Sequence, residues 1–188
     1  MKIPLAKPFF DEEELLELQQ VLDSGWVSQG PKVKEFEDAI SNYLGAKHVI
    51  AVSNCTAGLH LSLLALGIGK GDEVLVPDFT FPATGHSVLY CGATPIFIDA
   101  DLQTYNLDVN KIEEKITENT KAIIPVHTFG QPANMDKVKR IAEKYDLFIV
   151  EDAACALGAK WNDSFVGTIG DLGCFSLHAR KEITTGEG

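Results

Sequence analysis

Apolar residues recur along this chain in two alternating patterns, one typical of helices and one of short strands. Helical spacing predicts amphipathic helices over 11–25 and 31–45. Similar patterns predict further helices over 56–67, 82–92, 106–117 and 134–146. Runs rich in β-branched and aromatic residues predict strands over 48–53, 73–78, 94–99, 121–127, 147–152 and 172–178.

The alternation of strands and helices indicates the fold class. Strands that are apolar throughout and separated by helices are typical of a parallel sheet with both faces covered. We therefore expect an α/β fold of three layers on a mostly parallel sheet. The 188 residues, 45% of them hydrophobic, are enough for one domain with a substantial core.

The charge and composition of the chain disfavour several classes of function. The formal net charge of −11 disfavours a general binder of nucleic acids or anionic membranes, because phosphate attracts clustered Lys and Arg. No apolar run reaches the ~18 residues of a membrane span, and the first residues lack the apolar core of a signal peptide. The widely spaced cysteines indicate reduced thiols and neither a disulfide framework nor a zinc site. Small substrates remain open, because an acidic protein can contain a local cationic pocket. We expect a cytoplasmic protein.

Polar residues follow the predicted strands at the point where each strand ends. In an open parallel sheet, ligands bind at the carboxyl ends of the strands, so these side chains should meet in one crevice. The alternative for each position alone is that it caps the following helix. The polar ends are Ser53, Asn54, Asp78, Asp99, His127, Asp152 and His178.

The stretch SNCTAGLHL runs from a predicted strand into a predicted helix, with small residues at the junction. The backbone N–H groups of Cys55, Thr56 and Ala57 should therefore point out of a helix N-terminus, which favours a bound anion. The patterns of a P-loop and of a dinucleotide fingerprint are absent from the sequence.

The stretch VEDAACALGA places Asp152 at the end of a very apolar strand. A buried carboxylate needs a cation or good donors, such as Arg, a metal or a protonated ring nitrogen. Capping of the next turn is the structural alternative. A metal is disfavoured because the five histidines show no ligand spacing to Asp152 or to one another.

Two further stretches carry candidate chemistry. Phe79 and Phe81 in DFTFPATGH are placed to lie over a planar ligand, with core packing as the alternative. Ser176, His178 and Lys181 follow the last predicted strand. A partly desolvated lysine at that place can act as a nucleophile, whereas base rates favour an exposed lysine.

Together these features match the needs of one cofactor. A helix N-terminus for a phosphate, an aromatic face, a buried carboxylate for a ring nitrogen and a lysine amine for an aldehyde are the contacts that pyridoxal 5′-phosphate (PLP) requires. Several stretches of the sequence also resemble the DegT-type, StrS-like sugar aminotransferases. The resemblance runs through IPLAKPFF, SGWVSQGPKVKEFE, GDEVLVPDFTFPAT, IIPVHTFGQPANM, EDAACALGA and RKEITTGEG.

The resemblance implies roles for single residues. Lys181 resembles the lysine that binds the cofactor aldehyde, and Asp152 the partner of the ring nitrogen. Thr56, with the backbone of Cys55 and Ala57, resembles the phosphate-binding turn, to which the hydroxyl of Ser176 adds a contact. Phe81 resembles the aromatic residue that stacks on the ring.

One position departs from the family pattern. Cys155 stands near the cofactor where the family commonly has Gln or His. A thiol is a weak donor, so either another group such as His127 serves the ring or the tuning of the ring differs.

The resemblance further implies the aspartate aminotransferase-like fold and a homodimer. Residues 1–188 would form an N-terminal segment and an incomplete large PLP-binding domain, without the small C-terminal domain and inactive by themselves. The implied reaction moves an amino group from glutamate to a nucleotide-linked keto-deoxysugar. One alternative is a dehydratase of the same family, in which a histidine replaces the lysine. Another is a non-catalytic regulator or binding protein on this scaffold.

Overall fold

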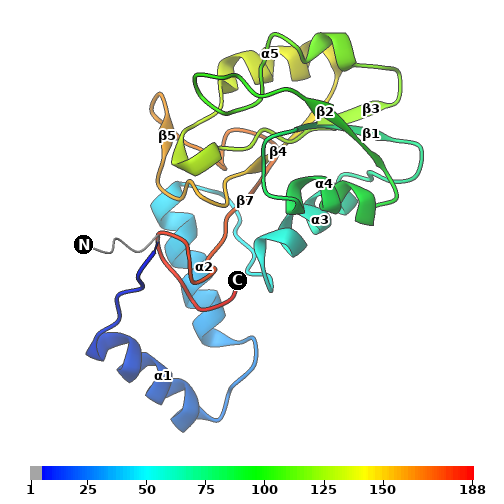
Figure 1. The fold of residues 1–188 in the computed structure, drawn as a ribbon. Helices are drawn as coiled ribbons and strands as arrows, with labels where there is room; N and C mark the ends of the chain where they lie inside the picture. The colour runs from blue at the N-terminus through cyan, green and yellow to red at the C-terminus, as the bar shows by residue number, and fades with distance from the viewer. Residues whose placement is uncertain (1–5) are drawn as a thin grey trace.

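The computed structural model describes residues 6–188 and shows a parallel sheet with helices on both faces (Figure 1). The strand order is β2-β1-β3-β4-β7, and every neighbouring pair is parallel. The expected fold class, three layers on a mostly parallel sheet, is confirmed. The strands are β1 (Glu73–Pro77), β2 (Thr94–Ile98), β3 (Thr120–Ile123), β4 (Phe148–Asp152) and β7 (Leu172–Cys174).

Alternating side chains of the strands bind the layers together. Val74 and Val76 face one core, which they share with Leu63 of α3 (Cys55–Ala65) and Val88 of α4 (Ala83–Tyr90). Leu75, between the two valines, points into the second core beneath α5 (Met135–Tyr145). Burial on both faces explains why the strand sequences are apolar throughout.

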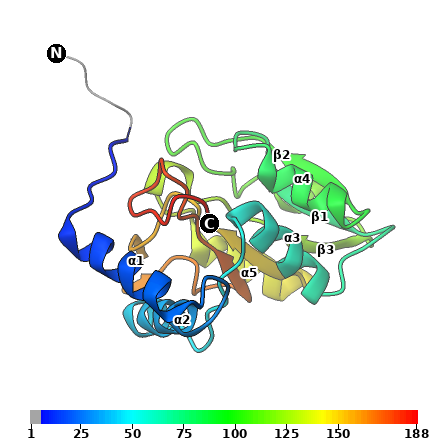
Figure 2. The same cartoon turned by 90° about the horizontal axis from the view of Figure 1, so that it is seen from below.

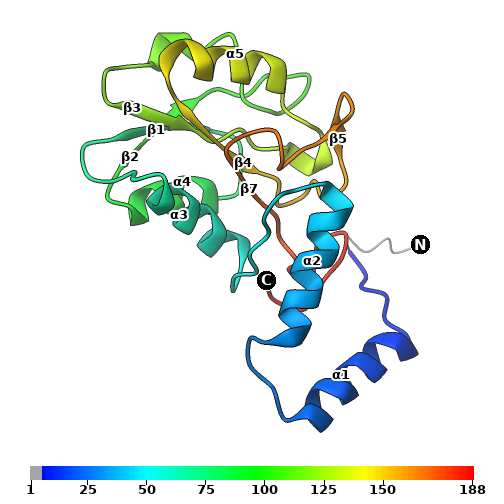
Figure 3. The same ribbon diagram turned by 180° about the vertical axis from the view of Figure 1, so that it is seen from behind.

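The first two helices stand apart from the sheet (Figure 3). α1 (Glu12–Ser24) begins at a capping box made by Asp11 and Glu14, and none of its residues is buried. α2 (Pro31–Leu44) begins with Pro31 and ends at Gly45, whose φ of 67° suits a left-handed cap. Both predicted helices are confirmed, and an ion pair of 2.6 Å between Lys32 and Glu17 joins them.

The strand predicted over 48–53 is wrong. The segment runs alongside α2 and forms no strand within the described part of the chain. The N–H of Ala51 donates to Glu37 of α2 at 2.9 Å, so a side chain takes the place of a neighbouring strand. Hydrophobicity alone does not show whether such a run finds a strand to pair with.

The helix predicted over 106–117 is also wrong. Only Glu113–Lys115 forms a short 3₁₀ turn, η1. The Asp108 carboxylate accepts hydrogen bonds from the backbone and side-chain N–H groups of Asn110 at 3.0 Å, a local turn that competes with a helix. Leu107 and Ile112 are buried in the core beneath α5. Their apolar spacing therefore reflects anchoring of a loop.

Smaller differences concern strand lengths and a hairpin. The strands expected over 121–127 and 172–178 end earlier, at Ile123 and Cys174. Beyond β3 the chain still follows β4, because Asp152 N–H donates to the carbonyl of Pro125 at 2.9 Å. The two-residue strands β5 (Lys160–Trp161) and β6 (Ser164–Phe165) form a hairpin that the sequence analysis missed.

Candidate active site at the carboxyl ends of the strands

The C-terminal segment lies beside the start of α3, as the view from below shows (Figure 2). This segment follows β7 and folds back on itself. Leu177 N–H donates to the carbonyl of Gly188 at 2.8 Å, and Ala179 N–H to that of Gly186 at 3.0 Å. The fold therefore brings Lys181 and the N-terminus of α3 to the same end of the sheet.

Asp152 is the last residue of β4, and its side chain is held between two donors. One carboxylate oxygen accepts a hydrogen bond of 2.8 Å from the hydroxyl of Thr84, and the other accepts one of 3.2 Å from Ala154 N–H. Thr84 lies in the first turn of α4 and is fully buried. Sequence reasoning missed Thr84, whose only signal is a threonine at the start of a helix near the strand ends.

Asp152 is 5% exposed, and that burial raises the pKa of its carboxyl. The hydrogen bonds from Thr84 and Ala154 and the charge of Lys181 act in the opposite direction. No ion pair with Asp152 forms among residues 6–188. A cation bound against this carboxylate would therefore be stabilised.

Lys181 is half-buried in the turn after β7. Its backbone N–H donates to the carbonyl of His178 at 2.9 Å, and its Nζ donates to Cys155 Sγ, also at 2.9 Å. Cys155 lies three residues after Asp152, on the turn that follows β4. The lysine, the thiol and the buried carboxylate thus lie around one end of β4.

The N-terminus of α3 offers free backbone donors. The side chain of Asn54 caps the helix by accepting from Ala57 N–H at 2.9 Å, so that amide is already engaged. For the amides of Cys55 and Thr56, the described residues supply no acceptor. These two N–H groups at the positive end of a helix suit a phosphate. Burial, followed by the charge of Asp152, raises the pKa of the Cys55 thiol.

The aromatic and hydroxyl candidates differ in their surroundings. Phe81 is 77% exposed and stacks on no ring among the described residues. Phe79 packs near Tyr105 and Phe129, with ring centroids 5.7 and 6.2 Å away. Ser176 is buried, and its hydroxyl accepts from His178 N–H at 3.3 Å. Phe81 therefore has a face available to a ligand, whereas Ser176 is held in the terminal segment.

His127 does not have a free donor for a ligand. Its Nδ1 accepts from Ala133 N–H and its Nε2 donates to Glu151, both at 3.0 Å. The side chains of His127 and Glu151 are fully buried. Both ring nitrogens of His127 are thus engaged within the chain. His127 therefore has no free ring nitrogen with which to take the role of the Gln or His that the family commonly has at the position of Cys155.

Glu151 organises the loop before β7. Its carboxylate also accepts hydrogen bonds of 2.8, 2.6 and 2.7 Å from the amides of Gly167, Ile169 and Gly170. Burial alone would raise its pKa, but the hydrogen bonds from His127 and from the amides of Gly170 and Gly167 lower it. The neighbouring carboxylates Glu151 and Asp152 therefore have opposite pKa shifts.

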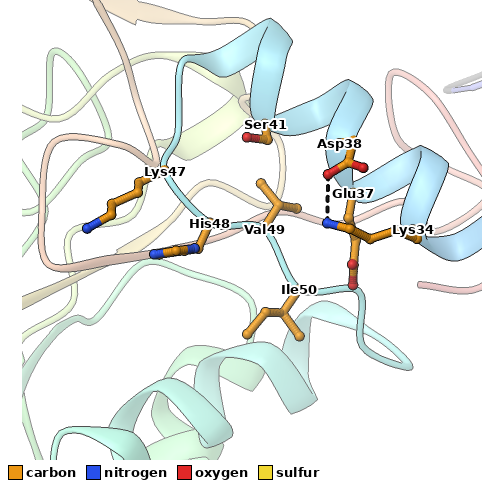
Figure 4. Close-up of a pocket in the computed structure, with 8 residues that line it drawn as sticks. All are labelled: Lys34, Glu37, Asp38, Ser41, Lys47, His48, Val49 and Ile50. Carbon is orange, nitrogen blue, oxygen red and sulfur yellow. Dashed lines mark hydrogen bonds and ion pairs between the residues drawn. The ribbon is translucent and has the colours of Figure 1, made fainter.

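A hollow of about 190 Å³ lies away from these residues, between α2 and segment 47–50 (Figure 4). Lys34 of its rim is paired with Asp38 at 2.7 Å. None of the candidate residues named from the sequence lines this hollow.

Within residues 6–188, no group of three or more His, Cys, Asp or Glu side chains could hold a metal ion. No described helix is long and apolar enough to cross a membrane.

Comparison with known proteins gives the chain relatives over its whole length. Residues 8–188 match the model of the DegT/DnrJ/EryC1/StrS aminotransferase family. "Uncharacterized protein MJ1066" of Methanocaldococcus jannaschii is 50% identical over 99% of this chain and 48% of its own length. GDP-perosamine synthase of Caulobacter vibrioides is 46% identical over 100% of this chain and 51% of its own length.

Solved structures are also similar to this chain over its whole length. The PLP-form of a putative sugar aminotransferase, Spr1654 from Streptococcus pneumoniae, superimposes with a TM-score of 0.96 at 36% identity. The match covers 100% of this chain and 52% of that one. A PMP-form of the same protein matches with a TM-score of 0.97. The chain spans about half the length of the relatives it matches.

Proposed function

Because this chain belongs to the DegT/DnrJ/EryC1/StrS aminotransferase family, we propose that the whole protein is a PLP-dependent sugar aminotransferase. It transfers an amino group from glutamate to a nucleotide-linked keto-deoxysugar. The observation that carries this proposal is that a buried carboxylate without an ion-pair partner in the described chain, Asp152, and the half-buried amine of Lys181 lie at the same end of β4.

The residues present fit the cofactor. The buried Asp152 carboxylate lacks a positive partner in the described chain, and a protonated pyridine nitrogen would supply one. The free amides of Cys55 and Thr56 suit the phosphate, and the exposed ring of Phe81 suits the flat face. Lys181 is the amine for the aldehyde. The Ser176 hydroxyl and the Ala57 amide, the other two expected phosphate contacts, form hydrogen bonds within the chain.

Bound PLP supplies an electron-withdrawing ring to the carbon that carries the amino group. The chain provides the rest of the chemistry. Asp152 keeps the proton on the ring nitrogen, and Thr84 and Ala154 hold its carboxylate in one orientation. The amine of Lys181, when free, would serve as the general base and acid that removes and returns a proton at the substrate carbon. Cys155 lies against that amine, where it affects how the amine is placed.

The name of one relative, GDP-perosamine synthase, supports a nucleotide-linked sugar as the acceptor. Presence of Lys181 disfavours the dehydratase alternative, since a histidine replaces this lysine in that branch. Glutamate as donor, a homodimer and a small C-terminal domain beyond residues 1–188 are parts of the same proposal. Four free thiols are consistent with a reducing cytoplasm.

Absorbance spectra and a substrate panel test the proposal. Full-length protein purified with PLP should show a visible or near-ultraviolet band that borohydride removes while leaving a covalent label on Lys181. Glutamate should then change the band and permit amination of at least one nucleotide keto-sugar. A protein that stays colourless with added cofactor would be a regulator or binding protein, and release of dehydrated sugar without amination would indicate the dehydratase.

A further inference from the structure

The contact between Lys181 and Cys155 joins two reactive groups. Lys181 Nζ lies 2.9 Å from Cys155 Sγ, close enough for attack of one atom on the other. Both side chains are half-buried, so neither is sealed from small solutes. We propose that Cys155 is a site of reversible oxidation, at which the oxidised sulfur is captured by the amine of Lys181. This inference rests on the proposed function for its consequence, because the captured amine is the one that would bind PLP.

The other three cysteines lack this arrangement. Cys55 and Cys174 are buried, and burial raises the pKa of Cys174 to about 11. Cys91 donates a long hydrogen bond of 3.8 Å to the carbonyl of His60, and burial raises its pKa as well. The thiolate is the form that reacts with oxidants, so these three sulfurs are poor targets. Among the described residues, Cys155 is the cysteine whose sulfur lies against a lysine amine.

The chemistry requires a peroxide as oxidant. Cys155 sulfur attacks one oxygen of hydrogen peroxide, the O–O bond breaks and water leaves, which gives a sulfenic acid. The uncharged amine of Lys181 then attacks that sulfur, an S–N bond forms, and the S–O bond breaks. The departing hydroxide takes the amine proton as a second water. Sulfur loses two electrons and peroxide gains them, so a thiol, an amine and one peroxide yield one S–N link and two waters.

The link would switch the site off reversibly. While nitrogen is bonded to Cys155, it is not available to the aldehyde of PLP. A small thiol attacks the sulfur and displaces the amine, which leaves a mixed disulfide on Cys155. A second small thiol then attacks that disulfide, releases the Cys155 thiol and leaves as a small-molecule disulfide, so both groups are restored. Bound cofactor prevents formation of the S–N link, since the amine of Lys181 is then occupied. The site therefore senses peroxide mainly when Lys181 is free.

Mass spectrometry of full-length protein tests the proposal. Cofactor-free protein is treated with hydrogen peroxide, digested without reductant and mapped, in parallel with PLP-loaded protein. The expected product is a Cys155 peptide joined to the Lys181 peptide, lighter by two hydrogen atoms than the sum of the two and separated by dithiothreitol. Cofactor should suppress it.

Three variants serve as controls. Cys155→Ser and Lys181→Arg should abolish the joined peptide, whereas Cys91→Ser, which removes a thiol elsewhere, should leave it unchanged. If the Cys155 peptide in Lys181→Arg is still joined to another peptide with the loss of two hydrogen atoms, the link is a disulfide to another cysteine, and that result overturns the proposal. So does oxygen addition at Cys155 without any link. A link that forms equally with and without PLP leaves this inference standing and counts against cofactor binding at Lys181.

Discussion

The hydroxyl of Thr84 donates a 2.8 Å hydrogen bond to the carboxylate of Asp152, although the two residues are 68 positions apart in the chain. A second hydroxyl, that of Thr80, lies 2.9 Å from the Thr84 oxygen. A threonine of α4 thus holds the carboxylate of Asp152, the last residue of β4, in one orientation. A buried carboxylate depends strongly on such donors, because each missing one leaves part of its charge without a partner.

Replacing Thr84 with Val keeps the shape of the side chain and removes this donor. We expect Thr84→Val to lower the free energy of unfolding by about 1–3 kcal/mol and to raise the pKa of Asp152 further. Urea titration gives the stability, and the affinity for PLP gives the effect on the site. Thr84→Ser keeps the hydroxyl and should behave much more like the parent. Equal loss in both variants would show that packing of the methyl group matters and the hydrogen bond does not.

Asp152→Asn preserves size and removes the negative charge. The fold should persist, as judged by circular dichroism. Turnover in the full-length protein should fall on the order of 100-fold or more, because the ring nitrogen loses the charge that keeps it protonated. Steady-state kinetics measure the change. Near-normal turnover would mean that Asp152 only caps the turn after β4.

Lys181→Ala removes the amine that the aldehyde requires. We expect no borohydride-stable label and no transamination, while phosphate contacts at α3 still hold some PLP non-covalently. Peptide mapping after borohydride checks the label. Lys160→Ala, an exposed lysine on the hairpin, is the matched control and should retain both properties. A label that survives in Lys181→Ala would reassign the lysine.

Glu151 should contribute to stability in a pH-dependent way. Its folded-state pKa is lowered from 4.5, so its contribution is present above that value and is lost as the pH falls through the lower folded pKa. Glu151→Gln also places an amide against backbone donors, and we expect a loss of about 3–5 kcal/mol near neutral pH. Urea midpoints at several pH values measure both effects. The difference between parent and variant should shrink in acid; a constant difference would contradict the role of the charge.

Gly173 in β7 lies directly against the backbone of Gly167, at a distance that leaves no room for a Cβ atom. Gly173→Ala should therefore displace the loop that Glu151 holds and destabilise the protein by at least about 1–3 kcal/mol. Gly69→Ala is the matched control, because its Cβ would meet only the Cys91 carbonyl at 4.0 Å. Thermal unfolding of the two variants checks the expectation. Similar melting temperatures would show that the strand shifts freely.

Much of the fold could be read from the order of residues. The buried strands 73–78 and 147–152 could be predicted, because a strand covered on both faces must be apolar at nearly every position. α2 is marked by Pro31 and Gly45, residues whose backbone preferences act locally. The polar residues that end the strands, Asp152 above all, indicated the end of the sheet at which the structure brings Asp152, Cys155 and Lys181 together. Each of these signals depends on a few neighbouring residues, and for that reason the sequence contains them.

Other features depend on residues that meet only after folding. Segment 48–53 has the composition of a strand but lies against Glu37, and Leu107 and Ile112 anchor a loop with helical spacing. Thr84 reaches Asp152 across the sheet, and Glu151 gathers amides from a loop 16 to 19 residues away. The sequence by itself determined the class of fold and the family, and it singled out Lys181 and Asp152 of the proposed site. Only the tertiary structure decided which donors hold those groups and that Cys155 faces Lys181, because hydrogen bonds are directional and their partners lie far apart in the chain.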